Sequence, residues 1–303
     1  MDVVSLFSGC GGTDVGFQKA GHDLIWSNDI NKWACASYAS NLGFEPESGD
    51  ISKIGKFPKA EIVVGCYPCQ GFSIYGARKF NDPRNFLYMQ FVRVLKQTKP
   101  KFFMAENVKG LLYGYGKIIF NDMLRNFKTN GYEVQWKLVN AKNYGVAQDR
   151  ERVIMIGTRN DLIKKYEFPE ETHGDGRKPY TTLKQVIWDM PKPNADEIYS
   201  GSFSSHYMSR NRKRAWDEVS FTIQASGRHA PLHPSGKAMI FVKKDKYKFD
   251  EVGPNRRMAY KECAVVQSLS KNFVLEGPLN EKYKQIGNAV PPLLAEAFAE
   301  SFN

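Results

Sequence analysis

Short apolar runs alternate with helical patterns from the start of the chain to about residue 160. The apolar runs predict strands at residues 3–7, 24–27, 62–65, 101–105 and 153–158. Amphipathic stretches between them predict helices at residues 14–20, 32–40 and 86–97, with Gly21 and Pro100 as stop signals. Strands that alternate with helices predict an α/β fold with a mostly parallel sheet and helices on both faces.

The pattern changes after residue 160. Residues 166–179 carry Pro, Gly and acidic residues without periodicity, which predicts a linker or loop. Polar turns and arginines then dominate to about residue 279, with short predicted strands at 220–224 and 239–242, before 284–302 return to a tight turn and an amphipathic helix. We therefore predict one domain formed by residues 1–165 and 284–303, and a smaller, irregular, mostly β domain formed by residues 166–283.

Composition and charge narrow the class of protein. Of the 303 residues, 42% are hydrophobic and 25% are charged, which is typical of a globular chain. Forty-three Lys and Arg against 32 Asp and Glu leave a formal charge of +11. This excess favours a polyanionic partner, although charge alone leaves a solvated basic surface equally open.

Cysteines and the start of the chain bear on the compartment. Five cysteines at irregular spacing do not form a disulfide framework. The first residues lack the basic region and apolar stretch of a signal peptide, and no run approaches the ~20 apolar residues of a membrane span. These features predict a soluble protein of a reducing compartment with no membrane partner.

A Gly-rich turn follows the first predicted strand. Gly9, Gly11 and Gly12 let the backbone approach a ligand closely, whereas Asp14 occupies the third glycine position of a dinucleotide motif. Asp29 ends the second predicted strand, where a carboxylate can accept both hydroxyls of a ribose.

A second aspartate extends this ligand site. Asp50 could accept a hydrogen bond from an exocyclic amine while Ile51 packs on an aromatic ring. Either Asp29 or Asp50 alone is more often a helix cap or turn residue. At successive strand ends the two together favour an adenosine-containing ligand, and S-adenosylmethionine fits better than NAD because a pyrophosphate motif is missing.

Two further strands lead to a cysteine and a glutamate, Cys69 and Glu106. Cys66 and Cys69 form a Cys-x-x-Cys pair, so redox and zinc chemistry are alternatives. Zinc would need a second ligand pair, and the other cysteines are isolated, so we predict no metal site. A thioredoxin-type pair would open a helix after the first strand, not follow a later one.

A thiolate and a carboxylic acid are the groups that methylation of cytosine at carbon 5 requires. A thiolate that adds to carbon 6 makes carbon 5 nucleophilic, and an acid bonded to nitrogen 3 neutralises the charge on the ring. Cys69 and Glu106 fill these two roles. Arg150 and Arg152 are spaced to point the same way and would support the base, or else belong to a solvated salt-bridge run. Because the target carbon is stacked in a duplex, such an enzyme must flip the nucleotide out.

These motifs resemble those of the bacterial DNA cytosine-5 methyltransferases in order and spacing over nearly the whole chain. The matching segments are residues 5–12, 68–70, 106–108, 148–152 and 287–292. The resemblance implies a Rossmann-like sheet that binds S-adenosylmethionine, and a target-recognition domain at residues 166–283. The implied cofactor-binding residues are Phe7, Ser8, Gly9, Cys10, Gly11, Gly12, Asp29, Ile30, Asp50, Ile51, Pro68, Leu87, Asn288 and Ala289.

Residues 208–214 and 221–228 resemble the recognition region of a family member that modifies the inner cytosine of GGCC. This resemblance implies DNA contacts by Ser73, Arg210, Arg212, Arg214 and Arg228, of which Arg210, Arg212 and Arg228 are the candidates for base contacts. Arg pairs bidentately with guanine in the major groove, although some of these arginines would only grip phosphates. Residues 256–270 depart from the family pattern, which bears on site preference rather than on chemistry.

The predicted function is a DNA cytosine-5 methyltransferase that acts as a monomer on double-stranded DNA in the bacterial cytoplasm, at the nucleoid. It would belong to a restriction–modification system with a cognate restriction endonuclease. Three alternatives stay open: a tRNA cytosine-5 methyltransferase of the same fold, a DNA-binding protein that has lost catalysis, and a redox enzyme that uses Cys66 and Cys69.

Overall fold

The computed structural model describes residues 1–68 and 86–302. Backbone contacts divide the chain into two compact units. Unit 1 comprises Met1–Asn140, Glu151–Glu170 and Ala295–Asn303, and unit 2 comprises Ala141–Arg150 and Glu171–Leu294. Residues 284–294, which the sequence assigns to the first domain, therefore group with unit 2, as do residues 141–150.

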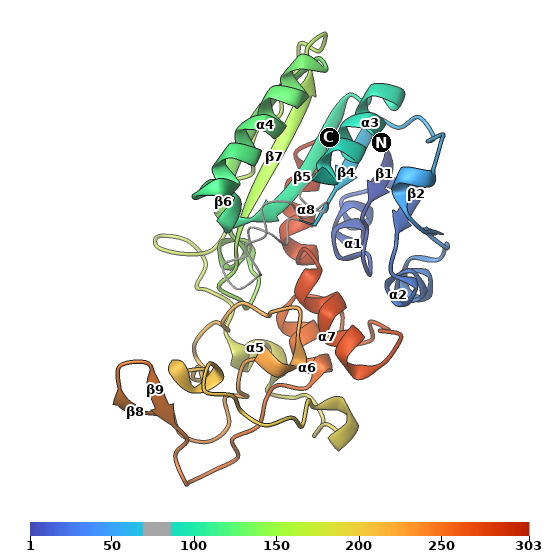
Figure 1. Cartoon of the computed structure of the whole chain (residues 1–303). Coiled ribbons are helices and arrows are strands. Elements are labelled where there is room, and N and C mark those ends of the chain that lie inside the picture. Colours follow the sequence, from blue (N-terminus) through green and yellow to red (C-terminus); the bar gives the residue numbers. More distant parts are fainter. Residues whose placement is uncertain (69–85, 303) are drawn as a thin grey trace. The chain divides into compact units, whose positions relative to one another are not determined.

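The described part of unit 1 contains a seven-stranded sheet in the order β3-β2-β1-β4-β5-β7-β6 (Figure 1). The strands are β1 (Asp2–Leu6), β2 (Asp23–Asp29), β3 (Glu47–Ser48), β4 (Ile62–Gly65), β5 (Phe102–Val108), β6 (Tyr132–Asn140) and β7 (Glu151–Arg159). The first five in the spatial order are parallel, whereas β7 runs antiparallel to both of its neighbours. The predicted α/β class with a mostly parallel sheet is confirmed.

Helices cover both faces of this sheet (Figure 1). They are α1 (Gly12–Lys19), α2 (Lys32–Leu42), α3 (Tyr88–Thr98), α4 (Tyr115–Thr129) and α8 (Pro292–Glu300), of which α8 begins in unit 2. Successive side chains of a strand point to opposite faces. Phe103 of β5 accordingly packs on Phe91 of α3 and Phe127 of α4, whereas Phe102 packs on Phe302, beyond the end of α8.

Two strands and one helix of unit 1 were not predicted: β3, β6 and α4. β6 lies at the edge of the sheet and its residues are mostly exposed or half-buried, in the sequence YEVQWKLVN. Such a strand has no continuous apolar run, because only one of its faces is buried. β6 lies between α4 and β7 in the sequence and pairs antiparallel with β7, which itself pairs antiparallel with β5.

Unit 2 is irregular, as predicted, with short helices. They are α5 (Leu183–Ile187), α6 (Tyr260–Val266) and α7 (Leu279–Asn288), with 3-10 turns η5 (Ala141–Tyr144), η6 (Ala195–Glu197), η7 (Tyr207–Ser209) and η8 (Gly227–His229). Its named strands in the described residues are β8 (Ile240–Lys243) and β9 (Lys246–Lys248), so the prediction of a mostly β domain is wrong.

The predicted strand at 220–224 is also wrong, whereas the one at 239–242 corresponds to β8. Ser220 forms only an isolated bridge with Gln148, and the Ile223 N–H donates to the Gln148 side chain at 2.9 Å. The backbone of this segment thus bonds the buried side chain of Gln148 and not a neighbouring strand. Among the described residues, none of the helices has the length and apolar character that a membrane span requires.

Candidate active site

Among the described residues of unit 1, the predicted site residues Phe7, Asp29 and Glu106 lie at the edge of the sheet where the parallel strands end. Leu6 of β1 pairs with both β2 and β4, and Gly65 of β4 pairs with β5. The residues that follow this common register are Phe7, Asp29, Cys66 and Glu106. Ligands of open parallel sheets bind at this edge, where the strand order reverses, and β1 is the strand at which it reverses in this sheet.

The Gly-rich turn between β1 and α1 leaves room for a ligand. Phe7, Gly9 and Gly11 adopt left-handed backbone conformations, with φ of 55°, 57° and 90°. At Gly11 a Cβ atom would lie 2.3 Å from the Leu42 side chain, so the turn needs glycine there for packing. At Gly9 a Cβ atom would meet nothing within 4 Å, so the turn is open on that side.

Asp29 fixes this turn to the end of β2. Its Oδ2 accepts a hydrogen bond from the Gly9 N–H and its Oδ1 one from the Asn31 N–H, both at 2.8 Å. A carboxylate oxygen can accept more than one hydrogen bond, so this arrangement is compatible with the predicted binding of ribose hydroxyls. The adjacent Ile30 side chain is 72% exposed, an apolar surface next to the carboxylate.

Asp50 and Ile51 form the next part of the edge, at the turn η1 (Ile51–Lys53). The Asp50 carboxylate accepts from the Ser52 N–H at 2.9 Å, and this backbone hydrogen bond lowers the pKa of Asp50. Ile51 is buried in the apolar cluster on which Phe7 and Leu87 also pack. Three of the predicted cofactor contacts therefore share one apolar surface.

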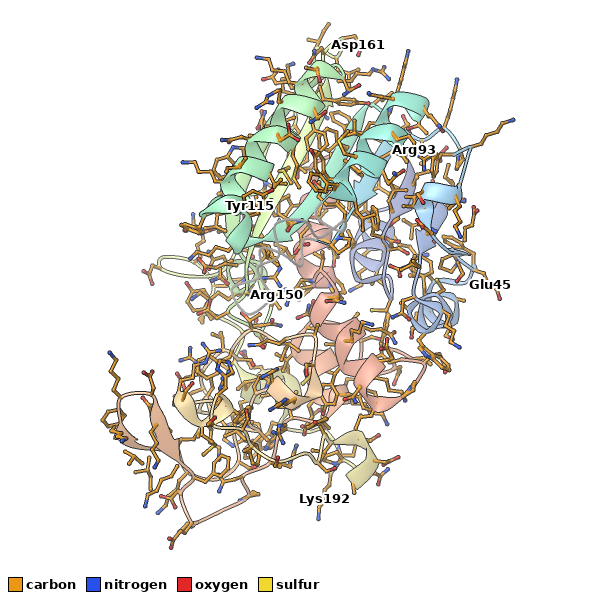
Figure 2. The ribbon with its side chains drawn as sticks, viewed as in Figure 1. Glu45, Arg93, Tyr115, Arg150, Asp161 and Lys192 are labelled. Atoms are coloured by element: carbon orange, nitrogen blue, oxygen red, sulfur yellow. The ribbon has the colours of Figure 1, made fainter. Side chains whose placement is uncertain are left out.

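Three positioning residues were missed from the sequence. Arg93 of α3 donates to the carbonyls of Ile51 and Ile54, each at 2.7 Å (Figure 2). Asn28 donates to the Glu47 carbonyl at 2.6 Å and so holds the segment before Asp50. Asn107 donates to the Tyr67 carbonyl at 3.2 Å and holds the segment before Pro68. These contacts join segments far apart in the sequence, and only Asn107, which follows the predicted acid, lies in a motif that the sequence marks.

Glu106 is paired with Arg152. In the β5–β7 ladder Val108 faces Arg152, so Arg152 lies diagonally across from Glu106 on the same face. Arg152 Nε lies 2.8 Å from Glu106 Oε1, and the two side chains are only 12% and 9% exposed. Burial lowers the pKa of Arg152, and the Glu106 carboxylate opposes that shift.

The geometry of this ion pair leaves Glu106 able to bond a ligand. Arg152 Nη1 donates to the Glu151 carbonyl at 2.7 Å, which orients the guanidinium. Glu106 Oε1 is buried and receives no well-aligned hydrogen bond from the described residues. The ion pair with Arg152 compensates its charge, and a donor on a ligand would add a hydrogen bond.

Arg150 and Arg152 have different partners, and the prediction that they point the same way stays a prediction. Arg150 belongs to unit 2, is 1% exposed and donates to the carbonyls of Ile223, Gly287 and Ala289 (Figure 2). These bonds anchor the end of α7, so the structure does not support a contact between Arg150 and a base. Arg152 lies one residue inside β7 and has a different partner.

The sulfur chemistry is only partly described. Cys69 and Ser73 lie outside the described residues, whereas Pro68, the residue before Cys69, is half-buried. Cys66 Sγ lies 3.4 Å from Thr13 Oγ1, and burial together with the nearby Glu106 carboxylate raises the pKa of the Cys66 thiol. A thiol kept protonated is a poor redox or metal-binding group. No cluster of metal-binding side chains occurs within residues 1–68 and 86–302.

Three further residues are predicted cofactor contacts: Cys10 in unit 1, and Asn288 and Ala289 in unit 2. Cys10 is buried, and burial raises the pKa of its thiol to about 12, so only its backbone could meet a ligand. The Ala289 carbonyl accepts from Arg150 and from Gln267 within unit 2. Asn288, at the end of α7, is exposed in the same unit.

The arginines of the predicted recognition region fall into two groups. Arg210 and Arg228 are exposed. Arg212 is buried, and its guanidinium donates to the Tyr207 carbonyl at 2.9 Å and the His206 carbonyl at 3.1 Å. The structure therefore does not support the predicted base contact of Arg212.

Arg214 is intermediate between these groups. It pairs with Glu218 at 2.9 Å and lies 4.1 Å from the centre of the Phe221 ring, with its side chain 30% exposed. This pair and ring contact orient the guanidinium near the surface of unit 2. A phosphate contact would suit this placement better than a base contact, because phosphates are reached at the protein surface.

Comparisons with known proteins agree on the class of enzyme. The family model for C-5 cytosine-specific DNA methylases matches residues 1–303. The type II methyltransferase M.BsuRI of Bacillus subtilis is 43% identical, over 99% of this chain and 78% of the relative. M.NgoPII of Neisseria gonorrhoeae is 41% identical, over 99% of this chain and 94% of the relative.

The fold agrees as well. A solved structure described as a prophage-encoded DNA modification methyltransferase of E. coli superimposes with a TM-score of 0.76 at 21% identity, over 100% of this chain and 98% of that one. At that identity the likeness supports the fold alone. The family match, the relatives and the site at the sheet edge lead to one conclusion: this chain belongs to the C-5 cytosine-specific DNA methylase family.

Proposed function

We propose that this DNA cytosine-5 methyltransferase transfers a methyl group from S-adenosylmethionine to a flipped cytosine in double-stranded DNA through a covalent adduct with Cys69. The observation that carries the proposal is the common register at the sheet edge. It sets Glu106, with its partner Arg152, level with Asp29 and the Gly-rich turn. The acid that would act on the base, at the end of β5, and the residues that would hold the cofactor, at the ends of β1 and β2, therefore lie at the same edge of the sheet.

The residues present fit the proposed cofactor. The open side of Gly9, the Asp29 carboxylate and the exposed Ile30 side chain would hold the ribose and one side of an adenine. Asp50 and Ile51 would hold the exocyclic amine and the ring. When bound, S-adenosylmethionine supplies the electrophilic methyl group that carbon 5 accepts.

The protein's own groups would act on the base in sequence. The Cys69 thiolate adds to carbon 6, and Glu106 donates its proton to nitrogen 3 as the electron pair moves into the ring. After methylation a base removes the proton from carbon 5, the carbon–sulfur bond breaks, and the proton on nitrogen 3 returns to Glu106. Arg152 would hold the Glu106 carboxylate in place between these steps.

For specificity we propose that unit 2 reads DNA at GGCC as part of a bacterial restriction–modification system. Arg210 and Arg228 are the arginines of the recognition region with exposed side chains, so they are the proposed base readers. The enzyme would act as a monomer in the cytoplasm, with a cognate endonuclease cutting unmodified sites. Residues 288 and 289 would complete the cofactor site, as the family resemblance implies.

The first test is transfer of labelled methyl from S-adenosylmethionine to unmethylated genomic DNA, followed by single-base mapping of 5-methylcytosine. We expect methylation at the inner cytosine of GGCC. Methylation at another motif would refute the proposed specificity and keep the chemistry. Label in tRNA but not in DNA would support an RNA methyltransferase, and no label from folded, cofactor-binding protein would support a silent DNA-binding protein.

The covalent step has its own test. A duplex with 5-fluorocytosine at the target position should trap the enzyme as a denaturation-resistant adduct, because fluorine replaces the proton that must leave. Cys69→Ser should form no adduct, whereas Cys66→Ser should keep it. Loss of activity in Cys66→Ser, with no adduct in the wild type, would favour the redox alternative and overturn the role of Cys69.

A further inference from the structure

β8 and β9 form a hairpin in unit 2 (Figure 1). It carries several positive charges and lies outside residues 208–214 and 221–228. Residues 240–248 contain four lysines and one aspartate. The lysines are Lys243, Lys244, Lys246 and Lys248, all exposed. None of them takes part in an ion pair within the described part of the chain.

The pairing of the hairpin places like charges together. Lys243 lies directly opposite Lys246 in the ladder, and Lys244 and Asp245 form the turn, with Asp245 left-handed at φ 57°. Like charges directly opposite each other destabilise an antiparallel pair. This pairing of like charges therefore does not stabilise the hairpin, and an anionic partner would reduce the repulsion between the two lysines.

One face of the hairpin is anchored and the other is left uncovered. Tyr247 and Phe249 pack on the apolar cluster that contains Tyr207. Lys246 and Lys248 point away from that cluster, because they alternate with Tyr247 along β9. Phe241 lies opposite Tyr247 and contacts its ring, so it shares the anchored face, although its side chain is 62% exposed.

The hairpin is joined to the segment that carries the proposed base reader Arg210. β9 lies against η7, which ends one residue before Arg210. The Arg212 N–H donates to Met239 Sδ at 3.2 Å, and Met239 directly precedes β8. A duplex bound at Arg210 would therefore continue over or beside the lysines.

We propose that the β8–β9 hairpin binds the phosphate backbone of duplex DNA beside the target site, through Lys243, Lys244, Lys246 and Lys248. The inference rests on the proposed DNA methyltransferase function. It adds a DNA-binding surface outside residues 208–214 and 221–228, which carry the proposed base readers. Lysines at phosphates hold the duplex in register and carry no sequence information.

The test replaces all four lysines by glutamine and measures binding to duplexes with and without the target site at several salt concentrations. The slope of log affinity against log salt is negative, and each lost phosphate contact reduces its magnitude by about 0.9. We therefore expect the magnitude to fall by about 2–4. Affinity should fall by the same factor for both duplexes. The mapped methylation sites, and the single-turnover rate at saturating DNA, should stay unchanged.

The matched control replaces four lysines of unit 1, Lys56, Lys59, Lys96 and Lys128, by glutamine. All four are exposed, so this variant removes the same charge from a different surface. An unchanged slope in the hairpin variant, or an equal reduction in the control, would overturn the proposal. Altered sequence preference would overturn it too, since it would make the hairpin a base reader.

A second variant guards against misfolding. Lys244→Gln changes only a turn residue outside the strand pairing, and should lower the slope by about 1. Because binding is measured separately from catalysis, the two proposals can fail independently. Wild-type protein that methylates no DNA would refute the proposed function, whereas the hairpin is judged by the difference between variants.

Discussion

At the residue scale, burial separates arginines that hold unit 2 together from those that can meet DNA. Arg150, Arg212 and Arg257 are buried, and each donates to backbone carbonyls. Arg257 bonds the Gly201 and Arg228 carbonyls and lies 3.9 Å from the centre of the Phe203 ring. It thus fixes the turn from which the exposed Arg228 side chain projects.

Arg228→Ala should therefore change the sequence preference, whereas Arg212→Ala should change the stability. Arg228→Ala should lose about 1–3 kcal/mol of discrimination at one base pair, because a bidentate contact to guanine is removed. Its melting temperature should stay unchanged. Arg212→Ala should lower the free energy of unfolding by about 1–3 kcal/mol, because buried carbonyls lose their donors.

Methylation mapping and denaturation of both variants measure these effects. Arg228→Lys serves as a control that keeps the charge but not the bidentate geometry. Unchanged sequence preference in Arg228→Ala would contradict its role as a base reader. Unchanged stability in Arg212→Ala, with relaxed specificity, would restore Arg212 as a reader.

At the element scale, the end of α7 illustrates a backbone contact that no sequence pattern specifies. A Cβ atom at Gly287 would lie 2.3 Å from the backbone N of Ala225 and from the carbonyl carbon of Gln224. Arg150 and Gln267 bond the carbonyls on either side of Asn288. The helix end can approach residues 224–225 this closely only because residue 287 has no side chain.

Gly287→Ala should destabilise the protein. Alanine favours a helix over glycine by about 1 kcal/mol, but forcing an extra carbon into a packed contact costs about 1–3 kcal/mol. The added carbon would clash with backbone atoms of residues 224–225, which cannot rotate away as a side chain can, so we expect a net loss of stability. Chemical denaturation measures it, with Gly55→Ala as the control because a Cβ atom there meets nothing within 4 Å. Equal stability of the two variants would show that the α7 contact can relax.

At the scale of the whole molecule, a buried carboxyl in unit 1 makes stability depend on pH. Asp14 lies in the first turn of α1, directly after the Gly-rich turn. It is fully buried and accepts a hydrogen bond from Ser5 Oγ at 2.7 Å. Burial raises the pKa of Asp14 to about 6, although the hydroxyls of Ser5 and Tyr38 oppose the shift. The folded protein therefore binds this proton more tightly than the unfolded chain does.

This linkage predicts that wild-type stability falls, through Asp14, as the pH rises from about 4 to about 7. Asp14→Asn has no ionisable group at this position, so its free energy of unfolding relative to that of the wild type should rise by about 3 kcal/mol over that interval. Above about pH 7 the difference should be constant. Denaturation of both proteins across this pH range measures it, and a difference that does not vary with pH would contradict the prediction.

Asp161→Asn is a control of opposite sign. Arg159 lowers the pKa of the exposed Asp161 (Figure 2), so its contribution is present above the unfolded pKa and lost at lower pH. The difference between this variant and the wild type should therefore shrink as the pH falls below about 4. Opposite trends in the two variants would separate a buried carboxyl from a paired surface carboxyl.

The sequence by itself determined the α/β class, five of the seven strands, the class of enzyme and the residues along the sheet edge. Apolar strands and the motifs at their ends are local features, so Gly9, Asp29 and Glu106 could be recognised without the fold. Cys69 was assigned by the same reasoning, and its role stays a prediction.

Only the tertiary structure decided which residues cooperate. The strand register placed Phe7, Asp29, Cys66 and Glu106 at one level and gave Glu106 its partner Arg152. Contacts within unit 2 bury Arg150 and Arg212 against backbone carbonyls. Spacing along the chain cannot show these outcomes, because whether an arginine is buried against carbonyls or exposed to a ligand depends on segments distant in the sequence.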